Sequence, residues 1–270
     1  MRYLLLVILS LNFALYSQSH KISTFNLKYE NLEDGIHKWQ NRKENVVNFI
    51  KIEQMDVIGM QEVLYSQIEY LENNLPNYQR LGVGRDDGKT KGEYSPIFFK
   101  KERYELVDSN TFWLSPNQNQ AGKGWDAAYI RICTWAKLLD KKKKETILFL
   151  NTHLDNEGEQ ARIKSIDLIM DVIKDMHHKG GTVLMGDFNL EPDNELIHKV
   201  IKFGFTDSYE APLKFGPKGT FNGFEINETH NRRIDYIFLK NFTPISYVVN
   251  SMIIDKSFLS DHFPVTVKIK

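Results

Sequence analysis

The chain has 270 residues, of which 41% are hydrophobic, and its 35 Lys and Arg residues balance 35 Asp and Glu residues. This length and apolar content suffice for one large folded domain. Proteins that bind nucleic-acid phosphates broadly usually carry a basic excess, so the zero net charge argues against that class, although a local basic patch is compatible with a balanced total.

Residues 1–19 have the pattern of a secretory signal peptide. Arg2 is followed by an apolar run over residues 4–16 and then by small polar residues, where a cleavage site is expected. The alternative, a buried N-terminal helix or strand, fits the polar break less well. The run is shorter than the ~20 residues of a membrane-spanning helix, so we expect no stable membrane anchor. The sequence therefore predicts an exported protein, periplasmic or extracellular, with its folded domain in residues 20–270.

Strand and helix patterns interleave along this domain. Apolar residues at helical spacing predict helices, and short alternating or apolar runs predict strands. The predicted helices cover residues 39–54, 66–74, 157–178 and 194–201. The predicted strands cover residues 20–27, 56–62, 78–83, 95–100, 104–114, 129–139, 146–152, 182–185, 234–239, 245–254 and 263–269. Many neighbouring strands have links of hairpin length. We therefore expect an α/β fold of two mixed, mainly antiparallel sheets packed together, with helices outside.

The connecting segments differ in what they suggest. Residues 84–93 form a polar, Gly-rich loop that is longer than a usual hairpin turn, which is typical of a functional loop. Residues 204–232 show no periodicity and are predicted to be irregular. Four consecutive lysines at 141–144 invite a nucleic-acid interpretation, but two predicted strands flank this short gap, so a solvated hairpin tip is favoured.

Six apolar segments each have a carboxylate, an amide or an imidazole at one end. Ligands in open α/β sheets bind outside the carboxyl ends of strands, so these residues are candidates for one shared site. The set comprises Asn26, Gln61–Glu62, Asn151–Asp155 with His153, Gly186–Asn189 with Asp187, Asp235, and Ser260–His262. Each alone has an ordinary explanation as a turn or a solvated residue, but all six together are difficult to produce by chance. The abundance of oxygen ligands suits Mg²⁺, Mn²⁺ or Ca²⁺ and not structural zinc.

In order, spacing and context these residues resemble the motifs of the endonuclease/exonuclease/phosphatase superfamily. That superfamily includes deoxyribonucleases, abasic-site endonucleases, deadenylases, inositol polyphosphate 5-phosphatases and neutral sphingomyelinases. The resemblance extends over essentially all of residues 21–270. It implies a four-layer α/β sandwich and hydrolysis of a phosphate ester by in-line attack of water, without a covalent enzyme intermediate.

The resemblance also implies a divalent-metal cofactor, Mg²⁺ or Mn²⁺. Glu62 would be the principal metal ligand. Asn26 would lie beside it and help to place metal and phosphate, and Asp261 would be a further carboxylate ligand or neighbour of the metal. These three residues are the predicted metal site.

Five further residues take catalytic roles by the same resemblance. Asp187 would orient or deprotonate the attacking water, and Asn189 would hold the phosphate or the nucleophile. His153 would donate a hydrogen bond to a phosphate oxygen. His262, held by Asp235, would stabilise the pentavalent transition state. Groups aimed at charge that develops in the transition state are the usual source of such catalysis.

Five residues are predicted to line a specificity pocket, because loops on a fixed scaffold set substrate choice. They are Arg85, Glu93, Trp125, Arg131 and Asn222. Ordinary loop packing is the alternative for four of them. An outward-facing position on a strand is the alternative for Arg131.

The predicted function is that of a divalent-metal-dependent phosphoesterase. The enclosed polar loops favour a compact phosphorylated substrate, such as a sugar phosphate or a nucleotide, over polymeric DNA or RNA. A nuclease is the alternative within the same chemistry. A non-catalytic binding module on the same scaffold is disfavoured because Glu62, Asp187 and His262 are all present. A monomer is expected.

Overall fold

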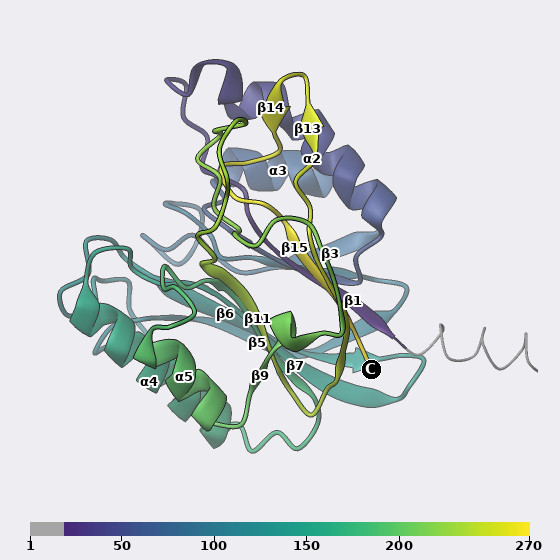
Figure 1. Cartoon of the computed structure of the whole chain (residues 1–270). Coiled ribbons are helices and arrows are strands. Elements are labelled where there is room, and N and C mark those ends of the chain that lie inside the picture. The colour runs from purple at the N-terminus through teal and green to yellow at the C-terminus, as the bar shows by residue number, and fades with distance from the viewer. Residues whose placement is uncertain (1–18) are drawn as a thin grey trace, which may run out of the picture.

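The structure is a computed structural model that describes residues 19–270. Two large β-sheets pack face to face, and helices cover their outer faces (Figure 1). The four-layer α/β sandwich expected from the sequence is therefore confirmed. Residues 1–18, which make up nearly all of the predicted signal peptide, lie outside the described residues. Within residues 19–270, no helix combines the length and apolar character that crossing a membrane requires.

The first sheet has seven strands. Their spatial order is β10 (Leu213–Phe215), β12 (Pro244–Val249), β15 (Val265–Ile269), β1 (His20–Asn26), β2 (Val57–Gln61), β4 (Ile97–Lys100) and β3 (Tyr78–Leu81). The pair β1 and β2 is parallel, so both strands end at the same edge, with Asn26 opposite Gln61. Strand β15 runs antiparallel to β1. Its beginning therefore lies at that same edge.

The second sheet has six strands. Their order is β5 (Tyr104–Trp113), β6 (Ile132–Asp140), β7 (Glu145–His153), β8 (Thr182–Asp187), β11 (Asp235–Lys240) and β9 (Thr206–Asp207). The parallel pair β7 and β8 places His153 opposite Asp187. The antiparallel pair β8 and β11 places Asp235 opposite Asp187 as well. Three polar residues are therefore neighbours by register alone.

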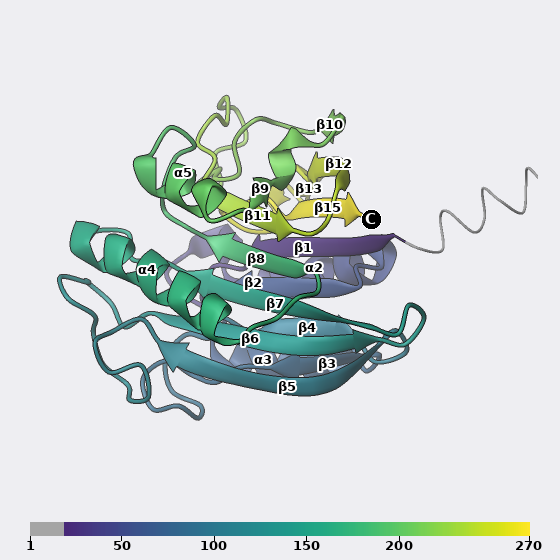
Figure 2. The same ribbon diagram turned by 90° about the horizontal axis from the view of Figure 1, so that it is seen from below.

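Helices α2 (Trp39–Glu53) and α3 (Tyr65–Asn74) pack on the outer face of the first sheet. Helices α4 (Glu159–Asp175) and α5 (Glu195–Lys202) cover the outer face of the second sheet (Figure 2). Short elements complete the described chain. They are the 3₁₀ turns η1 (Gly35–His37) and η2 (Ser208–Glu210) and the small hairpin of β13 (Ile253–Ile254) and β14 (Ser257–Phe258).

The main core lies between the two sheets. Ile22 and Val265 of the first sheet and Phe149 and Val183 of the second are fully buried in it. Two further apolar layers lie under the helices, one on each outer face. Because both sheets bury both faces, their central strands are mostly apolar, and the carboxylates, amides and imidazoles of the site stand at strand ends.

The structure differs from the predicted elements in several places. The strand expected over residues 129–139 begins only at Ile132, so Arg131 precedes β6 and is not a strand residue. The helix expected over residues 157–178 is shorter, at Glu159–Asp175. The strand expected over residues 245–254 divides into β12 and β13, with residues 250–252 outside both strands. Strand β13 then pairs with β14 in a hairpin whose turn is at Asp255 and Lys256, which have positive φ. The segment expected to be irregular contains β9, η2 and β10. The four lysines form the turn between β6 and β7, as predicted.

Candidate active site

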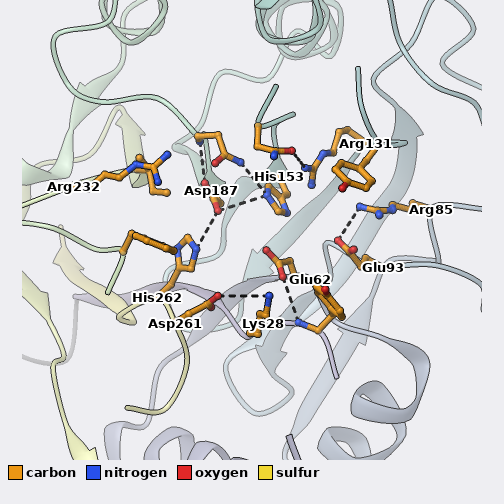
Figure 3. A pocket seen from close by; sticks show the side chains of 16 residues that line it. Lys28, Glu62, Arg85, Glu93, Arg131, His153, Asp187, Arg232, Asp261 and His262 are labelled. Atoms are coloured by element: carbon orange, nitrogen blue, oxygen red, sulfur yellow. Dashed lines mark hydrogen bonds and ion pairs between the residues drawn. The ribbon is translucent and has the colours of Figure 1, made fainter. Parts of the chain in front are cut away.

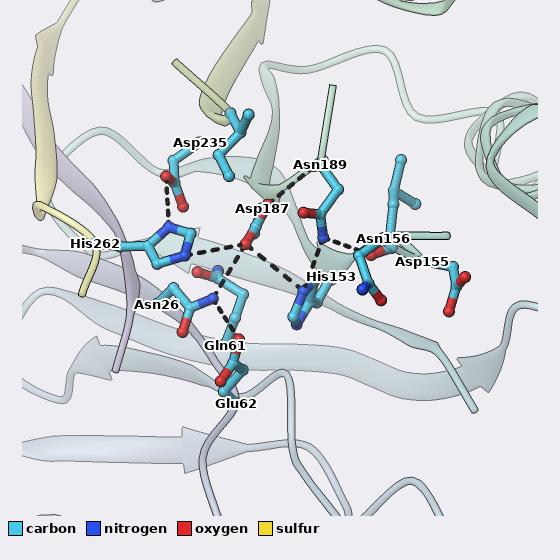
Figure 4. A network of polar contacts seen from close by, with 12 residues as sticks. Asn26, Gln61, Glu62, His153, Asp155, Asn156, Asp187, Asn189, Asp235 and His262 are labelled. Atoms are coloured by element: carbon cyan, nitrogen blue, oxygen red, sulfur yellow. Dashed lines mark hydrogen bonds and ion pairs between the residues drawn. The ribbon is translucent and has the colours of Figure 1, made fainter. Parts of the chain in front are cut away.

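The two sheets meet at the site through the side chain of Asn26. Its amide nitrogen donates to Glu62 Oε1 at 3.0 Å and to Asp187 Oδ2 at 3.1 Å (Figure 4). Asn26 and Glu62 belong to the first sheet, whereas Asp187 ends a strand of the second. One amide therefore connects the polar strand ends of both sheets at a single point.

Glu62 and Asn189 hold an unusual backbone conformation immediately after their strands. Their φ angles are 58° and 51°, in the left-handed region that residues other than glycine seldom adopt. The Glu62 carboxylate accepts a hydrogen bond from the Tyr29 amide at 3.4 Å, and the Asn189 amide donates to Asp187 Oδ1 at 2.9 Å. Backbone strain of this kind is concentrated at functional sites.

A buried amide bridge lies beneath the site and joins the two sheets. Gln61 Nε2 donates to Asn151 Oδ1 at 2.6 Å, while Asn151 Nδ2 donates to the carbonyl oxygens of Met60 at 2.7 Å and Pro96 at 2.8 Å. Gly59 allows this close approach, since a Cβ there would lie 2.7 Å from Asn151 Oδ1. The sequence identified Gln61 and Asn151 only as polar strand ends, and the structure shows that they fix the strand that ends at Glu62.

His262 and Asp235 form a buried pair. Nδ1 of His262 lies 2.9 Å from Asp235 Oδ2, and its Nε2 lies 3.7 Å from Asp187 Oδ2. Burial opposes the charged imidazole, but the Asp235 and Asp187 carboxylates outweigh it and raise the pKa of His262 to about 10. His262 is therefore a cation at neutral pH, aimed into the site.

Asp187 has the protonation properties of a general base. Burial, followed by the nearby charge of Asp235, raises the pKa of Asp187 to about 7. A carboxyl group whose pKa lies near the working pH is suited to accept a proton from water. Its Oδ2 lies within 4 Å of His262 and His153, so its neighbours on both sides are imidazoles.

His153 is held neutral. Burial and the positive charges of Arg131, His262 and Arg85 hold the pKa of His153 well below its usual range. Its Nε2 lies 3.1 Å from Asn189 Nδ2, which also donates to the carbonyl of Leu154 at 3.1 Å. The ring nitrogen therefore accepts from Asn189. Nε2 carries no proton in this arrangement, so donation to a phosphate by this nitrogen requires the other tautomer or a protonated ring, with Asn189 turned away from it.

Glu62 and Asp261 could supply carboxylate ligands to a hard divalent cation. Asn26 directs its amide nitrogen at Glu62, and its Oδ1 accepts from the Lys28 backbone amide at 3.0 Å, so its oxygen would have to exchange that hydrogen bond to reach a metal. Burial and the charge of Glu62 raise the pKa of Asp261, because together they outweigh the nearby positive groups. The two carboxylates therefore lie close enough to repel each other. The Lys28 ammonium lies 3.9 Å from Asp261 Oδ2. A carboxylate pair with one amide oxygen is a donor set that Mg²⁺ and Mn²⁺ prefer.

A second group of possible ligands consists of Asp187, Asp235 and His262, whose ligand atoms lie within 4.8 Å of one another. His262 is protonated there by its two carboxylate neighbours. An imidazolium has no free lone pair for a metal. The first group is therefore the better cation site.

A pocket of about 300 Å³ opens over these residues (Figure 3). Glu62, Asp187, Asp261 and His262 lie toward one side of it, and a second wall carries the larger recognition groups. That wall includes Arg85, Glu93, Tyr129, Arg131 and Asn156. Figure 3 shows Arg85 and Glu93 directed toward each other, with Nη1 to Oε2 at 2.8 Å.

Aromatic and charged groups stiffen this wall. The guanidinium groups of Arg85 and Arg131 lie 5.6 Å and 5.5 Å from the centre of the Tyr129 ring. Arg131 Nε also lies 3.4 Å from Asp155 Oδ2, and that carboxylate accepts backbone hydrogen bonds from the 128–129 segment. This wall therefore offers two cationic groups, the Glu93 carboxylate and one half-exposed aromatic ring.

Two residues predicted to line the pocket lie elsewhere. Trp125 is on the adjacent loop but does not reach the pocket. Asn222 is buried, and its amide donates to the carbonyl of Ser260, two residues before His262, at 3.0 Å. Its place is behind the His262 loop. A residue's place in a loop does not show which way its side chain points. Loop membership alone therefore cannot assign a residue to a specificity pocket.

Several lining residues were not predicted from the sequence. They are Lys28, Tyr29, Tyr129, Asn156, Phe221 and Ile234, and Arg232 was considered only as a residue that fixes a loop. Lys28 has a local signal, since it follows Asn26 by two residues. Tyr29, Asn156, Phe221 and Ile234 also stand within three residues of predicted site residues, but nothing in their local sequence shows that their side chains face the pocket.

A four-layer sandwich in which carboxylates, amides and imidazoles converge at one end of both sheets defines a hydrolase of phosphoester bonds. The comparison with protein families identifies it further. Residues 23–262 match the model of the endonuclease/exonuclease/phosphatase family, so the chain belongs to that family. Its members hydrolyse phosphoester bonds and generally depend on divalent metals.

Solved structures from Bacteroides are similar over nearly the whole chain. A family protein of Bacteroides vulgatus is 38% identical, with a TM-score of 0.90, and 94% of this chain and 99% of that one are covered. A mannosyl-6-phosphatase of Bacteroides thetaiotaomicron is 32% identical, with a TM-score of 0.88 and coverage of 93% and 99%. An uncharacterised protein of Acanthamoeba polyphaga mimivirus is 26% identical over 86% of this chain and 92% of its own length.

Proposed function

We propose that this protein is an exported, divalent-metal-dependent phosphatase that acts on a compact phosphorylated substrate, with sugar phosphates first among the candidates. The observation that carries the proposal is the pocket of about 300 Å³ that joins the catalytic strand ends to the Arg85–Glu93 wall. This volume suits a small molecule more than a polymer. The similarity to a mannosyl-6-phosphatase supports the same class.

The second wall of the pocket is suited to a hydroxylated substrate body. Glu93 is a partly buried carboxylate whose pKa is raised, chiefly by desolvation, and which Arg85 keeps oriented. An oriented carboxylate accepts hydrogen bonds from substrate hydroxyls, and the Tyr129 ring offers an apolar face beside it. Arg131 and Lys28 supply positive charge toward the phosphate. We therefore assign Arg85, Glu93 and Arg131 to substrate binding.

The residues of the chain support an in-line hydrolysis. Asp187 takes a proton from water as the water oxygen bonds to phosphorus, and the bond from phosphorus to the ester oxygen breaks. The ester oxygen keeps the bonding electrons and takes up a proton from solvent, so that the alcohol and inorganic phosphate leave. The His262 imidazolium faces the charge that develops on the phosphoryl oxygens, and Asp235 holds it in place. Asn189 and His153 hold the phosphoryl group. The Asn26, Glu62 and Asp261 set would hold Mg²⁺ or Mn²⁺, which supplies Lewis-acid stabilisation of the phosphate oxygens.

The export part of the proposal depends on residues 1–19, whose charged start and apolar run are typical of a signal peptide. Expression of the full chain followed by cell fractionation and N-terminal sequencing tests it. We expect a shortened protein outside the cytoplasm that begins near residue 20. An intact N-terminus in the cytoplasmic fraction would contradict export and leave the enzymatic proposal untouched.

The enzymatic proposal is tested by release of inorganic phosphate from a panel of substrates. The panel contains hexose 6-phosphates, nucleotides, single- and double-stranded DNA, RNA and sphingomyelin, each with Mg²⁺, Mn²⁺ or a chelator. We expect sugar phosphates to give the highest kcat/KM, and we expect chelation to abolish turnover and metal addition to restore it.

Other outcomes of the same panel are informative. Cleavage of DNA or RNA alone would favour the nuclease alternative. A probable RNA exonuclease of Saccharomyces cerevisiae is 25% identical to this chain over 174 residues, which cover 58% of this chain and 33% of that protein. Turnover that resists the chelator would refute the metal site. A protein that binds phosphate esters without cleaving any of them would be a binding module.

A further inference from the structure

Arg42 of helix α2 is buried beside the metal-ligand segments and makes all its hydrogen bonds to backbone carbonyls. Its side chain is 2% exposed. Nη1 donates to Leu27 O at 3.0 Å and to Leu259 O at 2.7 Å, and Nη2 lies 3.5 Å from Lys28 O. Nε donates to His37 O at 2.5 Å. One planar group therefore contacts segments that are more than 200 residues apart in sequence.

The two segments that Arg42 joins are those that carry the candidate metal ligands. Leu27 and Lys28 directly follow Asn26 at the end of β1, and Leu259 precedes Asp261 by two residues. Neither segment is a regular strand at the point of contact. The separation of the two ligands is therefore set by what holds these segments together.

The Arg42 guanidinium lies over the rings of Trp39 at 5.7 Å and Phe224 at 5.5 Å, but these contacts do not require its hydrogen-bond donors. Among residues 19–270 no carboxylate lies within ion-pair distance of Arg42. Burial lowers its pKa to about 10, opposed by the charges of Asp261, Asp34 and Glu62, and it remains a cation at neutral pH. A buried charge is costly, and an apolar side chain would fill the same space. The rigid fork of the guanidinium, with donors in fixed directions, is what an apolar residue lacks.

We propose that Arg42 is a positioning residue, which fixes the distance between Asn26 and Asp261 by binding the carbonyls beside each of them and so sets the affinity of the protein for its divalent metal. The inference rests on the proposed function, because it takes Asn26, Glu62 and Asp261 as the metal ligands. Arg42 touches neither substrate nor metal. Its effect passes through the backbone of the two segments.

The test is the affinity for Mn²⁺ in the absence of substrate, measured by titration calorimetry on the purified protein. Arg42→Lys keeps the charge but loses the fork, and Arg42→Met removes the charge while keeping the bulk. Loss of groups that orient metal ligands typically weakens metal binding by about 10–100-fold, and we expect both variants to show this. Raising the Mn²⁺ concentration should restore most of the kcat of Arg42→Lys.

The matched control is Arg103→Lys. Arg103 is likewise buried and bonded to Asp56 and Asp140, but it lies at the opposite end of the sheets. We expect this variant to melt at a lower temperature than the wild type and to bind Mn²⁺ with the wild-type affinity. Thermal unfolding of all variants separates loss of stability from loss of metal binding.

The outcomes separate this inference from the proposed function. If Arg42→Lys and Arg42→Met fold and bind Mn²⁺ as tightly as the wild type, Arg42 is structural only and the inference is wrong. If Arg103→Lys weakens Mn²⁺ binding as much as Arg42→Lys does, the effect is general destabilisation and the inference is also wrong. If the wild type binds no Mn²⁺, or if Glu62→Gln binds it equally well, the metal site of the proposed function fails instead.

Discussion

Asp187 is the residue on which most of the site converges. It lies beside Asn26 of the first sheet, His153 of the second sheet, and His262, which precedes β15 of the first sheet. Its neighbour Asp235 shares the same buried region. Two carboxylates so close cannot both ionise easily, and the charge of His262 partly compensates them. The acid–base properties of the site thus arise because these carboxylates and imidazoles are buried side by side.

Replacing Asp187 by Asn removes the proposed base while keeping the shape of the side chain. We expect kcat to fall by roughly 10²–10⁴-fold, the usual contribution of a general base, with the circular dichroism spectrum unchanged. Steady-state release of phosphate measures it. The control is Asp193→Asn, which changes an exposed residue of the following loop. Wild-type turnover in Asp187→Asn would exclude Asp187 as the base.

Strand β2 shows how an element carries a residue to the site. Its residues are fully buried, it pairs in parallel with β1, and its end is held by the Gln61–Asn151 bridge to the other sheet. The chain turns at the next residue, Glu62, which has a positive φ. The position of the Glu62 carboxylate therefore depends on the contact between the two sheets at Gln61 and Asn151.

A methyl group at Gly59 would disturb that contact. Its Cβ would lie 2.7 Å from Asn151 Oδ1 and 2.9 Å from Met185 Cε, and Asn151 cannot withdraw without losing its bonds to two backbone carbonyls. We expect Gly59→Ala to lower the free energy of unfolding by about 1–3 kcal/mol, as overpacking does, and to reduce activity. Urea denaturation measures the change.

The control for this prediction is Gly122→Ala. A Cβ at Gly122 meets nothing within 4 Å, so we expect a change of less than about 0.5 kcal/mol. Equal stability of the two variants would show that β2 and Asn151 can separate freely. The bridge would then not be what holds Glu62.

The whole molecule has a polar cluster at each end of its sheets. At the end opposite the active site, the first residue of β1, His20, lies beside Tyr104, Arg103 and Asp140. Nδ1 of His20 accepts from Tyr104 Oη at 2.7 Å and from Arg103 Nη2 at 3.0 Å. Burial and the positive charge of Arg103 outweigh Asp140 and lower the pKa of His20 to about 3.

This shift predicts loss of stability in mild acid. In the unfolded chain His20 takes up a proton near its ordinary pKa of 6.5, whereas the folded protein excludes that proton down to about pH 3. The stabilisation is therefore complete above pH 6.5 and is lost as the pH falls toward 3, by up to ~1.4 kcal/mol per pH unit. Urea unfolding between pH 7 and pH 4 measures it.

His20→Asn keeps an acceptor for Tyr104 and Arg103 but cannot take up the proton. We expect the stability of this variant to fall less steeply with decreasing pH. Other buried histidines with lowered pKa, such as His153, contribute equally to both proteins. Parallel pH curves for wild type and variant would contradict the account of His20.

The sequence by itself determined the layered fold, the residues at the strand ends and their chemical class. Periodicity shows which strand faces are apolar, and Asn26, Glu62, Asp187 and His262 stand out because each interrupts an apolar run. The register that makes Asp187 the neighbour of His153 and Asp235 came from the structure.

The tertiary structure alone decided which loop and helix residues reach the site. Trp125 and Asn222 had the same sequence context as Arg85 and Glu93, yet only the latter pair lines the pocket. Arg42 belongs to an apolar helix face, and its contact with Leu259 joins positions that no local pattern connects. The physical reason is that a repeat along one element fixes the side that a residue faces, whereas a pocket is made where segments distant in sequence come together.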